Sequence, residues 1–247
     1  MERCVGKEKK MEQMKITPKN SRLRALNTVV SEYEIDLEPE VLEPVTELLR
    51  EILGAEKEDE KYSKYSYLIE TVREFDGETF YHMIGVGLLA GVTAKKLELS
   101  DAEFEKVVIA GVLHDIGKVM VGTDILRKPC GVSEKEMIQI RKHSIYGYRL
   151  LSEVEKDSDI LFGVLMHHER FCGGGYPLNY NGEQIPLCAR ILAVCDTFDA
   201  LTSSRSYHTK SSVQDSLYYI VRSTRYDPYV SAAFKSAFQG GSCAWWK

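Results

Sequence analysis

From residue 62 onward, apolar side chains recur at intervals of three and four residues, and this spacing is the strongest constraint on the fold. It places apolar side chains on one face of an α-helix. No stretch shows the sustained alternation that is typical of a half-buried strand. The fold class that the pattern predicts is therefore all-α. Helices are expected at residues 79–97, 101–113, 134–151, 158–168, 186–204 and 212–222, and a last one is expected from Asp227, with Pro228 in its first turn.

Capping signals support two of the expected helix starts. In "SDAE", Ser100 precedes Glu103 by three residues, and in "SEKE", Ser133 precedes Glu136 by the same interval. In this arrangement the serine and the glutamate each satisfy an N–H group that the first helical turn leaves without a partner. We therefore expect helices to begin directly after these two serines.

Composition and charge exclude several classes of protein. The 247 residues are 44% hydrophobic and carry a formal net charge of −5, whereas proteins that bind nucleic-acid polymers usually have a basic surplus. The longest apolar run, at residues 83–94, is shorter than the ~20 residues of a membrane-spanning helix, and the N-terminus lacks the apolar segment of a secretory signal. The six cysteines form no CxxC pair, which favours a reducing compartment. We expect a cytoplasmic protein that binds neither nucleic-acid polymers nor membranes.

The first sixty residues differ in charge from the rest of the chain. Residues 1–24 hold eight Lys and Arg against three acids, and residues 32–60 hold twelve acids against two bases. We interpret them as a mobile basic arm followed by an acidic helical extension. The alternative is a segment that forms a homodimer or docks a partner. The expected division is an extension at 1–61, the main domain at 62–240 and a tail at 241–247.

Histidines and carboxylates recur together on the expected helices. Glu78 and His82 are four residues apart and share one helical face, as do Asp196 and Asp199, which are three apart. Each such pair alone is more often an exposed pair than a functional one. Their repetition, together with the histidines described next, points to a metal site.

The remaining candidate ligands lie at or near expected helix ends. His114 and Asp115 follow the apolar segment "VVIAGVL", His143 lies inside an expected helix, and His167 and His168 come directly before "ERFCGGGYP". Imidazole and carboxylate donors without a thiolate suit iron or manganese better than zinc or nickel. The sequence therefore predicts a metal centre with mixed nitrogen and oxygen ligands.

Five motifs, in order, resemble the HD-GYP family of the HD phosphohydrolases over roughly residues 66–238. They are "HDIGK", "ILRKP", "IRKHSIYGYRLL", "HHERFCGGGYP" and "IPLCARILAVCDTFDALTSSRSY". The resemblance implies an all-α HD-domain helical bundle, here with a short N-terminal helical extension. It also implies hydrolysis of cyclic di-GMP to pGpG or GMP at a centre of two or three divalent metal ions, with iron or manganese expected.

The resemblance also assigns roles to individual residues. It implies metal ligation by His82, His114, Asp115, His143, His167, His168 and Asp196. Glu78 matches an extra carboxylate of members that hold three metals. The positions that would face the substrate are Lys118, Gly174, Gly175, Tyr176 and Arg205. Asp199 and Glu169 are expected to contact and orient the metal ligands without binding metal themselves.

The chemistry of phosphodiester hydrolysis agrees with these roles. Asp115 is expected to be catalytic as the bridging ligand, because its two oxygens can each hold one ion, and a hydroxide between the ions would attack phosphorus. Lys118 is expected to stabilise the charge that develops on the phosphoryl oxygens. Arg205 can grip a phosphate with two hydrogen bonds. The ring of Tyr176 is expected to stack on a base or to form a wall of the pocket.

Two positions depart from the family pattern. The loop pattern HHERxDGxGYP has an aspartate where this chain has Cys172, and "RPYR" becomes "RSYH", with Ser206 and His208. We expect the missing acidic anchor at Cys172 to weaken the loop by ~1–3 kcal/mol, since a thiol is a weak acceptor. One alternative function is hydrolysis of another cyclic dinucleotide. The other is a catalytically silent module that binds a cyclic dinucleotide or a diguanylate cyclase through this loop.

Overall fold

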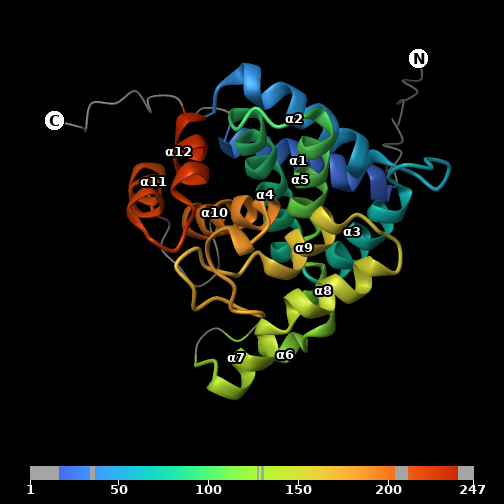
Figure 1. Cartoon of the computed structure of the whole chain (residues 1–247). Coiled ribbons are helices and arrows are strands. Elements are labelled where there is room, and N and C mark those ends of the chain that lie inside the picture. The colour runs from blue at the N-terminus through green and yellow to red at the C-terminus, as the bar shows by residue number, and fades with distance from the viewer. Residues whose placement is uncertain (1–16, 34–36, 127, 129–130, 204–210, 239–247) are drawn as a thin grey trace, which may run out of the picture.

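The computed structural model describes residues 17–33, 37–126, 128, 131–203 and 211–238 (Figure 1). Over these residues the chain forms helices and no strand, and one isolated antiparallel bridge joins Leu37 to Phe238. The predicted all-α class is confirmed. No helix in the described ranges combines the length and the apolar character that crossing a membrane requires.

Twelve α-helices and two short 3₁₀ helices make up the described part of the chain. In order they are α1 (Pro18–Tyr33), α2 (Pro39–Gly54), α3 (Ser63–Phe75), α4 (Gly77–Lys96), α5 (Asp101–Leu113), η1 (Ile116–Met120), α6 (Thr123–Leu126), α7 (Glu134–Arg141), α8 (His143–Ser152), α9 (Ser158–Met166), η2 (Gly182–Gln184), α10 (Leu187–Thr202), α11 (Val213–Arg222) and α12 (Pro228–Ser236).

Helix α4 is the centre of the bundle. From Phe80 to Ala94 every residue except Tyr81 is buried, as expected of a helix that is apolar on all sides. Helices α1, α2, α3, α5, α10 and α12 pack against it, and Figure 1 shows α4 between α5 and α10. A ligand carried by α4 therefore lies in the interior and can be approached from several helices.

The N-terminal helices belong to the same hydrophobic core. Leu26 on α1 and Leu49 on α2 are fully buried within it. Arg22 is only 5% exposed, and its guanidinium donates hydrogen bonds to the carbonyls of Leu53 and Ala55. The prediction of a mobile basic arm is therefore wrong for residues 18–24, which are helical. Residues 1–16 and the tail 241–247 lie outside the described residues, and the boundary at residue 61 stays a prediction.

The expected helices agree with the observed ones to within about two residues, with one exception. The single helix expected at 134–151 is two helices, α7 and α8, separated at Lys142. The break has a local cause: the ring of His143 hydrogen-bonds the carbonyl of Ile140, which an unbroken helix would pair with the N–H of Ser144. Both predicted capping boxes, at Ser100 and Ser133, are present.

Candidate metal centre

Three helix ends place three histidines at one point in the bundle. His114 directly follows α5, His167 directly follows α9, and His143 lies two residues beyond the end of α7. Nδ1 of each ring lies close to the carbonyl oxygen three residues earlier. The distance is 2.8 Å for His114, 2.7 Å for His167 and 2.7 Å for His143. The last carbonyls of a helix lack intrahelical partners, so an imidazole N–H can satisfy one of them. The helix ends thus orient the rings.

This bond leaves Nε2 of each ring as the atom that faces the site. Nδ1 must carry the proton to donate to a carbonyl, so Nε2 presents a lone pair. Nε2 of His143 lies 3.2 Å from Nε2 of His167, and Nε2 of His114 lies 3.3 Å from Nε2 of His82. Lone pairs at this separation repel each other, and a cation between them removes the repulsion.

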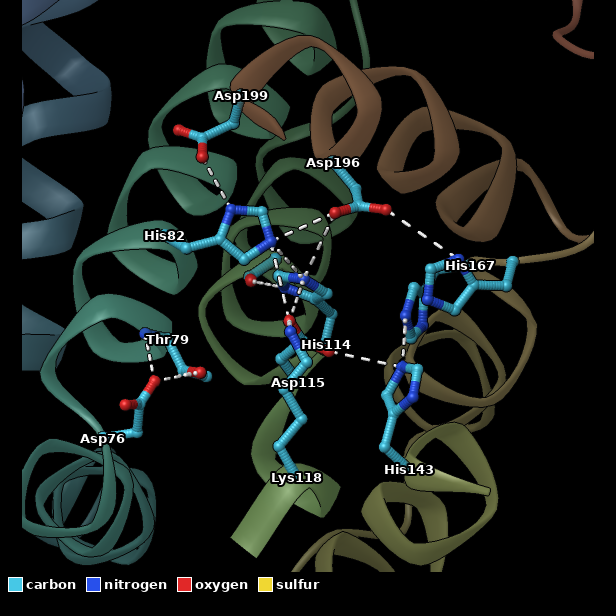
Figure 2. A network of polar contacts seen from close by, with 12 residues as sticks. Asp76, Thr79, His82, His114, Asp115, Lys118, His143, His167, Asp196 and Asp199 are labelled. Atoms are coloured by element: carbon cyan, nitrogen blue, oxygen red, sulfur yellow. Dashed lines mark hydrogen bonds and ion pairs between the residues drawn. The ribbon is translucent and has the colours of Figure 1, made fainter. Parts of the chain in front are cut away.

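His82, on α4, is oriented in a different way. Its Nδ1 lies 2.6 Å from Oδ2 of Asp199, and its Nε2 lies 3.0 Å from Oδ1 of Asp196 (Figure 2). Both aspartates come from α10 and are three residues apart, as the sequence predicts. Asp199 thus fixes the orientation of the His82 ring, while Asp196 lies beside Nε2 of His82, the atom that faces the site.

Asp115 lies between two groups of donor atoms. The first group consists of His82, His114 and Asp115 itself. The second group consists of His143, His167 and His168. Within each group, the donor atoms lie within 4.8 Å of one another. Oδ2 of Asp115 lies 3.3 Å from Nε2 of His114, whereas its Oδ1 lies 3.3 Å from Nε2 of His143. The side chain is buried, and Oδ1 has no hydrogen-bond partner among the described residues. A carboxylate oxygen in this state fits a metal ligand, because burial without a partner is costly.

A second carboxylate spans the same two groups. Oδ1 of Asp196 contacts His82, and its Oδ2 lies 3.8 Å from Nδ1 of His168. Two carboxylates and five imidazoles therefore converge, and the donor set fits two divalent cations. The identity of the metal stays a prediction.

The protonation states suit metal binding. Burial raises the pKa of Asp115, but the charge of Lys118 outweighs it and holds the pKa well below its usual range. Burial likewise raises the pKa of Asp196, but the contact with His82 outweighs it, so that this pKa also lies well below its usual value. Both carboxylates are therefore anionic at neutral pH.

The imidazoles are shifted toward the neutral form that binds metals. Burial lowers the pKa of His143 and lowers that of His167 well below the usual range. It also lowers the pKa of His168 to about 3. Anionic carboxylates and neutral imidazoles are the ligand forms that a divalent ion requires.

Lys118 extends from η1 to the centre of the site. Its Nζ lies 2.5 Å from Oδ2 of Asp115, three residues earlier (Figure 2). The side chain is mostly buried, and its charge reaches the carboxylate that joins the two donor groups. This position agrees with the role predicted for Lys118 beside the reacting phosphate.

The glycine loop has an acidic anchor, but not at the position considered above. Glu169 is 1% exposed, and its carboxylate accepts hydrogen bonds from the backbone N–H groups of Leu178, Asn179 and Tyr180 at 2.6, 3.0 and 3.1 Å. Cys172 is exposed. Glu169 thus holds the loop from the buried side, and the expected weakening at Cys172, where the family pattern has an aspartate, stays a prediction.

The rest of the loop forms one wall of the site. A Cβ at Gly175 would overlap the backbone of Glu169, so only glycine fits there. The ring of Tyr176 stacks on His168, with centroids 4.7 Å apart and planes at 29°. The guanidinium carbon of Arg141 lies 5.3 Å from the Tyr176 ring centroid. Tyr176 thus lies beside the candidate ligand His168, and its expected contact with a base or role as a pocket wall stays a prediction.

Glu78 is a member of neither donor group. It is exposed in the first turn of α4, where it lines a cavity of about 380 Å³ together with His82 and Asp199. Its role as a ligand of a third ion stays a prediction. Arg205, Ser206 and His208 lie outside the described residues.

Two residues near the site were missed by the sequence analysis. Arg141 contacts Tyr176, and its position two residues before His143 was a usable signal. Tyr33 on α1 donates a hydrogen bond to Asp199 across 166 positions of the chain, and no local pattern marks it.

Similar proteins agree with this architecture. The family model described as "HD domain" matches residues 51–230. The cyclic di-GMP phosphodiesterase response regulator RpfG of Xanthomonas campestris is 35% identical over 84% of this chain and 53% of its own length. The cyclic di-GMP phosphodiesterase PA4108 of Pseudomonas aeruginosa is 38% identical over 66% of this chain and 40% of its own. The 3'3'-cGAMP-specific phosphodiesterase 3 of Vibrio cholerae is 33% identical over 63% of this chain and 34% of its own length.

This chain thus spans about half of these relatives' length or less. Among solved structures, Bd1817, an HDG"Y"P protein from Bdellovibrio bacteriovorus, aligns with a TM-score of 0.55 at 14% identity, over 87% of this chain and 68% of its own, which supports the fold. The relatives confirm the resemblance that the motifs indicated. Because the family model covers well over half of the residues, this chain belongs to the HD domain family.

Proposed function

We propose that this chain is a metal-dependent phosphodiesterase that hydrolyses cyclic di-GMP to pGpG, to GMP or to both. The observation that carries the proposal is Asp115, which is buried between two groups of imidazole donors with one oxygen toward each group. The names of RpfG and PA4108 supply the substrate class.

The residues divide between two ion positions. His82, His114, Asp115 and Asp196 would hold one ion, and Asp115, His143, His167 and His168 would hold the other. Iron or manganese suits this donor set. When bound, such ions would supply an activated water and electrostatic stabilisation of the phosphoryl oxygens.

The chain's own groups would position and stabilise the substrate. Lys118 lies beside Asp115 in a mostly buried position, where a positive charge acts strongly on a developing negative charge. The loop around Gly174 and Gly175, held by Glu169, would admit the dinucleotide, with Tyr176 as its wall. Arg205 would grip a phosphate, as the resemblance implies.

A second candidate substrate is 3'3'-cGAMP, which differs from cyclic di-GMP in one base. The similarity to a phosphodiesterase specific for 3'3'-cGAMP favours including it. The alternative is a silent module, to which the departure at Cys172 points, and it would bind a cyclic dinucleotide or a diguanylate cyclase without turnover. A diguanylate cyclase partner and a homodimer stay predictions.

The test combines metal analysis with substrate profiling. Protein loaded with Mn²⁺ or, without oxygen, with Fe²⁺ is incubated with cyclic di-GMP, 3'3'-cGAMP and a linear mononucleotide, and the products are separated by chromatography. We expect at least two ions per chain and turnover of cyclic di-GMP above both others. Faster turnover of 3'3'-cGAMP would assign the second substrate. A fully loaded protein that hydrolyses neither dinucleotide would refute the proposal.

A further inference from the structure

His82 differs from the three histidines that helix ends orient. Its Nδ1 pairs with the carboxylate of Asp199 at 2.6 Å, whereas the other three use a carbonyl three residues away. Asp199 is on α10 and His82 on α4, so the orientation of this ring depends on how two helices pack. Such a carboxylate fixes the tautomer of a metal-binding histidine and raises its basicity.

Asp199 is itself held by the N-terminal helix. The hydroxyl of Tyr33, on α1, donates a hydrogen bond to Oδ1 of Asp199 at 3.0 Å, while Oδ2 faces His82. Both Tyr33 and Asp199 are nearly fully buried. Helix α4 makes room for the carboxylate at Gly85, where a Cβ would overlap Oδ1 of Asp199. A chain of contacts thus runs from α1 through α10 to α4.

The position of the Tyr33 hydroxyl is set by packing along α1. Arg22 ties the first turns of α1 to the end of α2, and Leu26 and Val29 are buried in the core. The Tyr33 ring packs against Phe198 with centroids 6.4 Å apart. All of α1 lies before residue 51, where the family match begins, so this contact comes from outside the matched region.

We propose that Tyr33 is a positioning residue for the metal ligand His82, acting through Asp199, and that α1 thereby sets the affinity of the ion held by His82 and His114. The inference rests on the proposed metal centre but not on the identity of the substrate. The other ion, at His143, His167 and His168, has no contact of this kind among the described residues, because the rings of His143 and His167 are oriented by their own helices.

The expected effect is a selective loss of metal affinity. Removing an outer partner of a metal ligand typically costs 10- to 100-fold in affinity, and Tyr33 acts one step further out than Asp199. We therefore expect Tyr33→Phe to lower the affinity for the ion held by His82 and His114 about tenfold. The affinity for the other ion should stay unchanged. Phenylalanine keeps the ring that packs on Phe198, so the variant should fold.

Calorimetric titration of the metal-free full chain with Mn²⁺ tests the proposal. Tyr67→Phe is the matched control, because it removes a hydroxyl from a side chain that is 75% exposed on α3, and we expect wild-type affinities for it. Thermal unfolding without metal is measured in parallel. A lower melting temperature for Tyr33→Phe with both affinities unchanged would show a purely structural role and overturn the proposal.

A double-mutant cycle with Asp199→Asn tests the route through Asp199. If Tyr33 acts through this carboxylate, Tyr33→Phe should change affinity much less in the Asp199→Asn background than in the wild type. An equal tenfold loss in both backgrounds would refute the route. Wild-type protein that binds no divalent ion would overturn the proposed function as well, whereas normal binding with no effect of Tyr33→Phe would overturn this inference alone.

Discussion

Glu169 is expected to determine whether the glycine loop keeps its working shape. Its buried carboxylate accepts three backbone hydrogen bonds from consecutive residues of the loop, Leu178, Asn179 and Tyr180. Glu169→Ala removes both oxygens and therefore all three hydrogen bonds at once. Each buried donor left without a partner costs about 1–3 kcal/mol, but these loop residues are exposed, so water can replace part of the loss. We expect a local destabilisation of about 3 kcal/mol.

Glu169→Gln should have a smaller effect. Its amide oxygen can still accept from Leu178 and Asn179, which share one carboxylate oxygen, whereas its NH₂ group would face the N–H of Tyr180. One bond of the three is lost, together with the charge. We expect about 1–2 kcal/mol for this variant.

Hydrogen exchange of the loop and steady-state kinetics measure these effects together. Glu169→Ala should speed exchange at residues 174–180 about 100-fold, as ~3 kcal/mol implies, and should lower kcat/KM for cyclic di-GMP with two ions still bound. Metal analysis is needed because His168 is adjacent in the chain. Cys172→Asp is the control: because Cys172 is exposed and the anchor is already present, kcat/KM should stay within about twofold.

Two results would refute this reasoning. One is Glu169→Ala with wild-type exchange and kinetics, which would mean that the loop does not depend on the carboxylate. The other is a large gain in kcat/KM for Cys172→Asp, which would restore position 172 as the anchor that the family pattern suggests.

Four further predictions concern the metal centre and the fold. Asp115→Ala should release both ions and abolish hydrolysis, since it removes the ligand shared by the two donor groups, and near-normal turnover with full metal content would contradict the centre. Lys118→Ala should keep the ions but lower kcat about 100-fold in steady-state assays, and an unchanged kcat would exclude an electrostatic role for Lys118. If Glu78 holds a third ion, elemental analysis of Glu78→Ala should show one ion fewer while the pair at Asp115 remains, and equal stoichiometry in both proteins would rule that ion out. Burial raises the pKa of Glu155, but hydrogen bonds from Tyr65 and from backbone N–H groups lower it to about 2, so its ionised form stabilises the fold above pH ~4.5 and this stabilisation is lost as the pH falls toward 2. Melting curves of wild type and Glu155→Gln should therefore differ at pH 7 and converge near pH 2, and a difference that does not depend on pH would contradict this assignment.

The sequence by itself determined the helices and the ligands that helix ends carry. Apolar spacing predicted α4, α5 and α9 because helical periodicity is a local property of the chain. His114 and His167 also follow local rules, since each bonds a carbonyl three residues earlier that its helix leaves without a partner. The motif order then predicted which of these residues meet.

Tertiary structure alone decided the contacts between residues that are far apart in the chain. The exposure of Glu78 and the anchoring of the loop by Glu169 depend on how helices and loops pack, and the residue types permit other arrangements. The contact of Tyr33 with Asp199 is the clearest case. It joins residues 166 positions apart on helices α1 and α10, and it exists only because α1 packs against α4 at the point where Gly85 leaves room for a carboxylate.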